Sequence, residues 1–199
     1  MIFWKDRKES KEPLKKEGFL IDTMLVSTPL IQTGCFQHSV IFLCEHSKTG
    51  AMGIILNKEL KGVDKKEMIT KMGVEYNEKM NLPIMLGGPV DTTRGFVVHS
   101  SDYETENTIK YKSGISITSE KKILNDYMDG SGPKNLMLVM GYAGWIAGQL
   151  EDEIEDNSWL TVPAAADLVF ESDVDSIWQK SAGLNGIDPF KLSPFGGSA

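Results

Sequence analysis

The first group of residues able to do chemistry lies in a glycine-rich stretch in the second half of the chain. Residues 141–151 read Gly-Tyr-Ala-Gly-Trp-Ile-Ala-Gly-Gln-Leu-Glu and directly follow the apolar run 136–140. This order predicts a buried strand that breaks into a glycine-rich turn, which then opens a helix. The backbone N–H groups at such a turn lack partners and lie at a positive dipole end, where proteins often hold anions or phosphates. The same geometry also serves plain strand-to-helix packing.

A second group combines adjacent glycines with an arginine. Gly87 and Gly88 permit a close backbone approach, and the guanidinium of Arg94 can grip a carboxylate or phosphate with two parallel hydrogen bonds. Turn chemistry alone also explains the glycines, and Arg94 can instead pair with Asp91 or Asp102. If the strands before the two turns are neighbours, we expect both turns to face one hollow. The expected ligand-binding residues are Gly87, Gly88, Arg94, Gly141, Gly144, Trp145, Gln149 and Glu151.

Cysteine and histidine residues offer an alternative chemistry. Cys35, His38, Cys44 and His46 carry thiols and imidazoles, but their spacing is wrong for a zinc knuckle. In an extended strand Cys44 and His46 share a face, and His38 is near enough in sequence to lower the pKa of Cys35. A thiol-dependent or metal-dependent enzyme or redox sensor built on these residues is the alternative function.

The acidic residues after the glycine-rich stretch suggest a third possibility. Glu151 and Glu155 are four residues apart, as are Asp152 and Asp156, so each pair places like charges together on a helix. A divalent cation or a basic partner would relieve this repulsion, whereas a solvated acidic face explains it without either. The chain has no Gly-x-Ser-x-Gly elbow, no Walker loop and no Gly-x-Gly-x-x-Gly after a strand, so we expect no cofactor and no metal.

Composition limits the classes of partner. The 199 residues carry a formal net charge of −7, which opposes binding to the phosphate backbone of nucleic acids. Two cysteines are too few for a disulfide framework, the basic and acidic residues 5–9 do not fit a secretory signal, and no apolar run is long enough to span a membrane. These features predict a cytoplasmic protein whose partner is a small anion or another protein.

The hydrophobic pattern predicts an α+β fold with one large mixed, mostly antiparallel sheet flanked by helices. A single domain over 18–190 is expected, with flexible tails at 1–17 and 191–199. Ser119 is the expected N-cap of a helix at 121–128, and 91–94 is the expected turn between two strands. The predicted strands are 19–26, 40–44, 51–56, 82–86, 95–99, 135–140 and 159–162, with a strand pair or bulged strand at 108–118; the predicted helices are 64–72, 121–128, 145–157 and 173–182, the third burying Ile146, Leu150 and Ile154.

Several motifs in order resemble the YqgE/AlgH family. They are the segments 44–46, 50–53, 87–90, 94–96, 141–145 and 148–151, followed by Asn157, Trp159-Leu160, Pro163 and Trp178. The resemblance implies a compact α+β domain and a cytosolic bacterial protein of a family labelled as transcriptional regulators, with no agreed catalytic or cofactor residues. Direct DNA binding is doubtful because the charge is acidic and no helix-turn-helix is visible. We therefore expect a non-enzymatic binding or regulatory protein.

Overall fold

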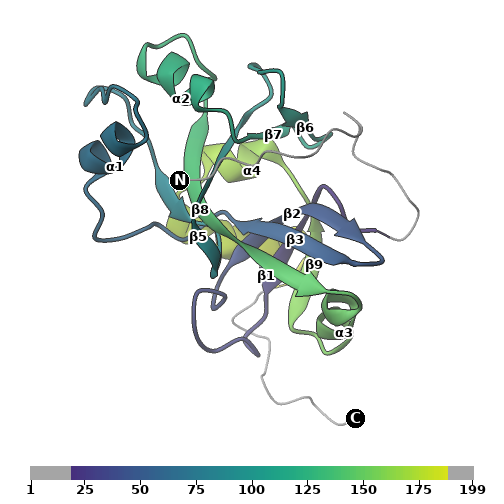
Figure 1. The fold of residues 1–199 in the computed structure, drawn as a ribbon. Helices are drawn as coiled ribbons and strands as arrows, with labels where there is room; N and C mark the ends of the chain where they lie inside the picture. The colour runs from purple at the N-terminus through teal and green to yellow at the C-terminus, as the bar shows by residue number, and fades with distance from the viewer. Residues whose placement is uncertain (1–18, 188–199) are drawn as a thin grey trace, which may run out of the picture.

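The computed structural model describes residues 19–187, so the predicted tails at 1–17 and 191–199 lie outside the described part of the chain. The described residues form one large sheet with helices around it (Figure 1). Its strands are β1 (Thr23–Ser27), β2 (Val40–Ser47), β3 (Gly50–Ile55), β4 (Ile84–Leu86), β5 (Val90–Ser100), β6 (Ile109–Lys110), β7 (Ile115–Thr118), β8 (Leu136–Ile146) and β9 (Trp159–Pro163). The helices are α1 (Lys65–Lys71), α2 (Lys121–Met128), α3 (Gln149–Glu155), α4 (Ala166–Glu171) and α5 (Val174–Gly183).

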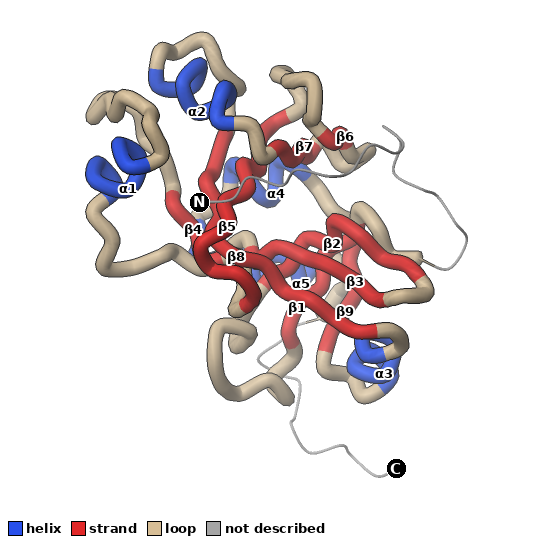
Figure 2. The backbone as a smooth tube through the Cα atoms, in the orientation of Figure 1, coloured by secondary structure: helices blue, strands red, loops and turns tan. Residues whose placement is uncertain are grey.

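The strand order is β6-β7-β5-β8-β3-β2-β1-β9, and every pair along this path is antiparallel. β4 adds a short parallel pair to β8, beside the half of β8 that precedes its contact with β3. The predicted α+β class with a mixed, mostly antiparallel sheet is therefore confirmed. Figure 2 shows the sheet curling: β8 first runs steeply beside β5 and then turns to run alongside β3 toward α3.

The sheet has two covered faces and three core clusters. One face packs against α4 and α5, and we call it the α4/α5 face; its core includes Phe42, Phe96 and Trp178. The opposite face, the α1–α3 face, has two clusters. One lies under α1 and α2 around Leu138, and the other lies under α3 around Trp145. Side chains alternate between the faces along each strand, as the two-residue period requires.

Gly141 changes that alternation inside β8. It has a φ of +75°, a left-handed conformation that glycine adopts without steric cost, and the pairing with β5 shifts at this point. Met140 and Ala143 consequently lie on the same face, three positions apart. The glycine-rich stretch is thus a bulged strand, and our prediction of a turn opening a helix at 145 is wrong: β8 continues to Ile146 and α3 begins at Gln149.

Three further local predictions need correction. Glu120, rather than Ser119, occupies the N-cap of α2, and it makes no side-chain cap bond. The expected turn at 91–94 belongs to β5, in which the register shifts between Val90 and Gly95. Ile146, expected in a buried helical stripe, ends β8 with 76% of its surface exposed. In the last two cases the continuation of a strand overrides a local sequence signal.

Helix α1 follows its sequence signal more closely. The Asp64 carboxylate accepts a hydrogen bond from the Glu67 backbone N–H at 2.9 Å, as an N-cap does, and Ile69 fixes the helix in the core.

Across residues 19–187, none of the helices combines the length and apolar character that a membrane span needs.

Candidate functional site

The carboxylate of Glu153 links helix α3 to two tryptophans of the sheet. Trp145 Nε1–H and Trp159 Nε1–H both donate to Glu153 Oε2, at 2.8 and 2.7 Å. Gln149 Nε2 donates to Glu153 Oε1 at 2.9 Å, and Gln149 Oε1 accepts from the Ile146 backbone N–H at 3.1 Å. The indole rings meet edge to face, with centroids 6.2 Å apart. The polar groups of two predicted ligand-binding residues, Trp145 and Gln149, are therefore hydrogen-bonded to other parts of the protein.

Glu151, another predicted residue, contacts the end of β2. Its Oε1 lies 2.9 Å from His46 Nε2, while the Leu20 backbone N–H donates to His46 Nδ1 at 3.0 Å. The pKa of Glu151 is lowered, chiefly by its own backbone N–H; burial opposes this effect, and the hydrogen bond and charge of His46 lower the pKa further. Both ring nitrogens of His46 are engaged, so this histidine is not available as a general base in this conformation.

Three predicted glycines pack against one another. Gly87 N–H donates to the Met140 carbonyl at 2.7 Å, and a Cβ on Gly87 would lie 2.3 Å from the Gly141 carbonyl oxygen. A Cβ on Gly88, whose φ is +152°, would lie 2.2 Å from the Tyr142 carbonyl carbon. Close approach of the two backbones is sufficient to account for glycine at these positions.

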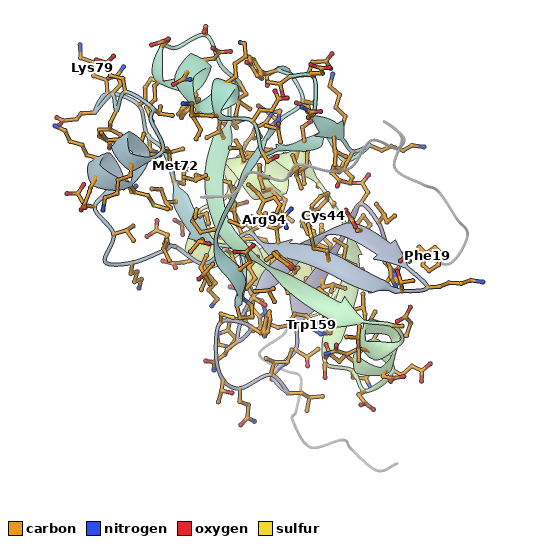
Figure 3. All side chains as sticks on the ribbon, in the orientation of Figure 1. Phe19, Cys44, Met72, Lys79, Arg94 and Trp159 are labelled. Atoms are coloured by element: carbon orange, nitrogen blue, oxygen red, sulfur yellow. The ribbon has the colours of Figure 1, made fainter. Side chains whose placement is uncertain are left out.

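Arg94 lies apart from Trp145 and Gln149. Its guanidinium carbon lies 5.3 Å from the centroid of the Phe96 ring, which contacts the Tyr142 ring edge to face. Phe96 belongs to the core of the α4/α5 face, whereas Trp145 belongs to the α1–α3 face. The single hollow that we expected to join Arg94, Trp145 and Gln149 is therefore not formed. Figure 3 shows Arg94 near the centre of the view and Trp159, which shares Glu153 with Trp145, well below it.

Gly144 differs from the other glycines of the set. It is exposed, its φ is not in the left-handed region, and a Cβ there would meet only the Tyr142 ring, at an ordinary 3.5 Å. Its cross-strand partner is Met52, and Ile146 lies two positions along the same face of β8. We call the patch formed by Met52, Val90, Tyr142, Gly144 and Ile146 the Gly144 surface; Met52 and Tyr142 are half-buried and the others are exposed.

The Gly144 surface continues to Arg94. Val90 is the cross-strand partner of Tyr142, so both lie on the α4/α5 face, and Phe96 links Tyr142 to the guanidinium. Apolar side chains, a flat glycine position and a positive charge thus lie along one face. Of the predicted set, this arrangement brings together Gly144 and Arg94.

The thiols and imidazoles do not assemble. A bulge at Cys44 places its side chain in the α4/α5 core, whereas His46 is opposite Ala51 on the other face, so the expectation that they share a face is wrong. Burial raises the pKa of the Cys44 thiol well above its usual value and that of Cys35 to a smaller degree. The His38 ring stacks on Trp178 of the α4/α5 core, while Cys35 packs against the cluster under α3. Among residues 19–187, no group of three His, Cys, Asp or Glu side chains is arranged to hold a metal ion.

Sequence reasoning selected Gly144 but missed the other members of the Gly144 surface, which are Met52, Val90, Tyr142 and Ile146. Tyr142, Gly144 and Ile146 alternate with period two, which was the available signal for a continuing strand. Glu153 was also missed, because its place among other acidic residues does not predict that it accepts hydrogen bonds from two tryptophans.

Comparisons with known proteins agree with this architecture. A family model described as AlgH-like matches residues 24–190. The chain is 42% identical over 202 residues to UPF0301 protein blr1492 of Bradyrhizobium diazoefficiens, covering 97% of this chain and 94% of that protein. It is 39% identical over 186 residues to UPF0301 protein Rru_A3059 of Rhodospirillum rubrum, covering 93% and 97%.

Two solved structures extend the comparison. The solution structure of the AlgH protein from Pseudomonas aeruginosa matches with a TM-score of 0.72 and 30% identity, covering 94% of this chain and 99% of that one. The crystal structure of DIP2367 from Corynebacterium diphtheriae matches with a TM-score of 0.66 at 20% identity, covering 85% and 89%, and shows the shared fold. Because the AlgH-like family model matches residues 24–190, which are most of this chain, the chain belongs to the AlgH-like family.

Proposed function

We propose that this protein is a non-enzymatic binding protein whose ligand contacts the Gly144 surface. The supporting observation is Gly144 itself, an exposed glycine inside a strand where the neighbouring atoms leave room for a side chain. A glycine in a strand weakens it, and such positions often mark the close approach of a ligand or another backbone.

The chemistry of the surface favours a small anion that carries a flat apolar group. Met52, Tyr142 and Ile146 supply apolar contact beside the glycine, and the Arg94 guanidinium on the Phe96 ring supplies positive charge. Trp145, Gln149 and Glu151 act in this proposal as supports that hold α3 against the sheet. Regulation would then act through this ligand, since the net charge of −7 opposes direct contact with DNA.

The test is a binding experiment on the full chain labelled with nitrogen-15. Amide shifts are recorded during titration with the metabolite fraction of a bacterial extract and with 8-anilinonaphthalene-1-sulfonate, a defined apolar anion. We expect shifts at Met52, Gly144 and Ile146. The variant Gly144→Val is expected to keep the folded spectrum and to weaken binding at least tenfold, about 1.4 kcal/mol or more.

Ala147→Val is the matched control, because Ala147 is exposed and lies just beyond β8. It should bind both probes as the wild type does. Shifts confined to other parts of the sheet, or undiminished binding by a folded Gly144→Val, would rule out the proposed surface.

A further inference from the structure

The backbone of Gly144 faces away from β3. From Ala143 to Ile146, β8 pairs with β3 without a register shift, so successive residues turn their N–H and C=O groups alternately toward β3 and away from it. A Cβ on Gly50 would lie 2.2 Å from the Trp145 carbonyl oxygen, which shows that Trp145 turns its backbone toward β3. The two neighbours of Trp145, Gly144 and Ile146, therefore turn theirs to the opposite side.

The positions on either side of Gly144 along this edge are occupied. Val90, the first residue of β5, pairs with Tyr142, while the Ile146 N–H donates to Gln149 Oε1 at 3.1 Å. In the described part of the chain, the hydrogen bonds of turns, loops and side chains do not include the Gly144 backbone. Strand residues rise about 3.4 Å each, so the gap from Tyr142 to Ile146 is about 14 Å long. It has room for one residue-sized group opposite Gly144.

The backbone of Gly144 determines which chemical groups fit this gap. An antiparallel residue opposite Gly144 would exchange two hydrogen bonds with it, donating from N–H to the glycine C=O and accepting from the glycine N–H. In line with β5, which is antiparallel to β8, such a residue would point its carboxyl end toward Val90. Because Val90 occupies the next position, the ligand must end there. An α-amino acid with an acylated nitrogen fits, since its amide N–H is a donor and its free carboxylate an acceptor.

The missing side chain of Gly144 leaves room for the side chain of such a ligand. Partners directly opposite each other in an antiparallel pair place their side chains on the same face. An L-amino acid would therefore place its side chain on the α4/α5 face, with Tyr142 and Ile146 as diagonal neighbours. A Cβ at Gly144 would meet only the Tyr142 ring, and the Ile146 side chain is exposed. A large apolar side chain on the ligand would cover this surface.

We propose that the Gly144 surface selects N-acylated L-amino acids with a large apolar side chain. This inference rests on the proposed function and names the ligand class of the same surface. The carboxylate is the anion, the amide N–H pairs with the Gly144 C=O, and the side chain is the flat apolar group. The ligand is a single residue, because a longer peptide would have to displace Gln149 from the Ile146 N–H.

Titration of the full chain, labelled with nitrogen-15, tests this with N-acetyl-L-phenylalaninate and three related probes. We expect the first probe to shift the amides of Tyr142, Gly144 and Ile146. Its D-enantiomer, whose ring would leave the α4/α5 face, should bind about tenfold more weakly. O-acetyl-L-3-phenyllactate has an ester oxygen in place of the N–H and should bind about fivefold more weakly, the loss of one hydrogen bond. Acetyl-Ala-Ala-phenylalaninate should bind no more tightly than the single residue.

Two exposed apolar residues provide matched variants. Ile146→Ala should weaken binding of N-acetyl-L-phenylalaninate about threefold and leave that of N-acetylglycinate unchanged, because only the former has a ring to contact Ile146. Leu184 is 53% exposed and lies at the end of α5, away from β8 in sequence. Leu184→Ala should bind both compounds as the wild type does.

The outcomes separate this inference from the proposed function. Equal binding of the two enantiomers, or of the amide and the ester, would overturn the inference while leaving the proposed function intact. So would binding of 8-anilinonaphthalene-1-sulfonate to the Gly144 surface without binding of N-acetyl-L-phenylalaninate. Tighter binding of the tripeptide would overturn the limit to a single residue. If none of these anions shifts the Gly144 surface, both proposals are wrong.

Discussion

Replacing Glu153 with alanine removes the oxygen that two buried indole N–H groups share. Trp145 and Trp159 are 7% and 4% exposed, and both donate to Glu153 Oε2. A buried donor left without its acceptor costs about 1–3 kcal/mol. Because Glu153 lies on a half-exposed helix, water can reach part of the gap, and we expect a total loss of about 2–4 kcal/mol. For a domain of this size, that lowers Tm by about 4–16 °C.

Urea unfolding followed by far-UV circular dichroism measures this loss, and near-UV dichroism reports the packing of the two indoles. Glu153→Gln keeps an acceptor oxygen and should lose less than the alanine variant. Glu155→Ala changes an exposed carboxylate on the same helix, and its effect should be within about 0.5 kcal/mol. A Glu153→Ala protein as stable as the wild type, with an unchanged near-UV spectrum, would show that the carboxylate does not hold α3 to the sheet.

Three further predictions address the backbone, pH and the thiols. Gly88→Ala should lower the free energy of unfolding by about 3 kcal/mol or more, because the added Cβ would lie 2.2 Å from the Tyr142 backbone. Urea unfolding measures this loss, and a loss below about 1 kcal/mol would contradict the prediction. Burial lowers the pKa of His99 in the folded protein. The free energy of unfolding should therefore be highest above about pH 6.5 and should fall as the pH drops from there toward the lowered pKa of the folded state. Urea unfolding from pH 8 to 5 should show this fall, and His99→Asn should give a flatter profile. Iodoacetamide should label Cys35 before Cys44, which intact mass after brief labelling will show; equal rates in the folded protein would contradict the buried position of Cys44.

The sequence predicted the sheet because its strands are buried on both faces. Runs such as 40–44 are apolar at consecutive positions, and the structure places them in the middle of the sheet order. The class and most strand positions follow from this pattern. The pairing of β4 with β8 does not, since a three-residue parallel pair leaves no periodic trace in the sequence.

The candidate site was harder to predict because a glycine has several structural uses. Gly87, Gly88 and Gly141 serve backbone contacts between segments more than fifty residues apart, and only the folded chain shows those contacts. Gly144 looks the same in sequence, yet its Cβ position is nearly open. A bulge adds a second difficulty, because one extra residue reverses the faces of everything after it, as Cys44 and His46 show.

Strand β8 determines how cooperatively the domain should unfold. It contributes Val139 to the core of the α4/α5 face, Leu138 to the cluster under α1 and α2, and Ala143 to the cluster under α3. One continuous strand therefore joins the half of the sheet that contains β4 and β5 to the half that contains β3. The molecule should unfold as one cooperative unit, with the slowest amide exchange concentrated along this shared spine.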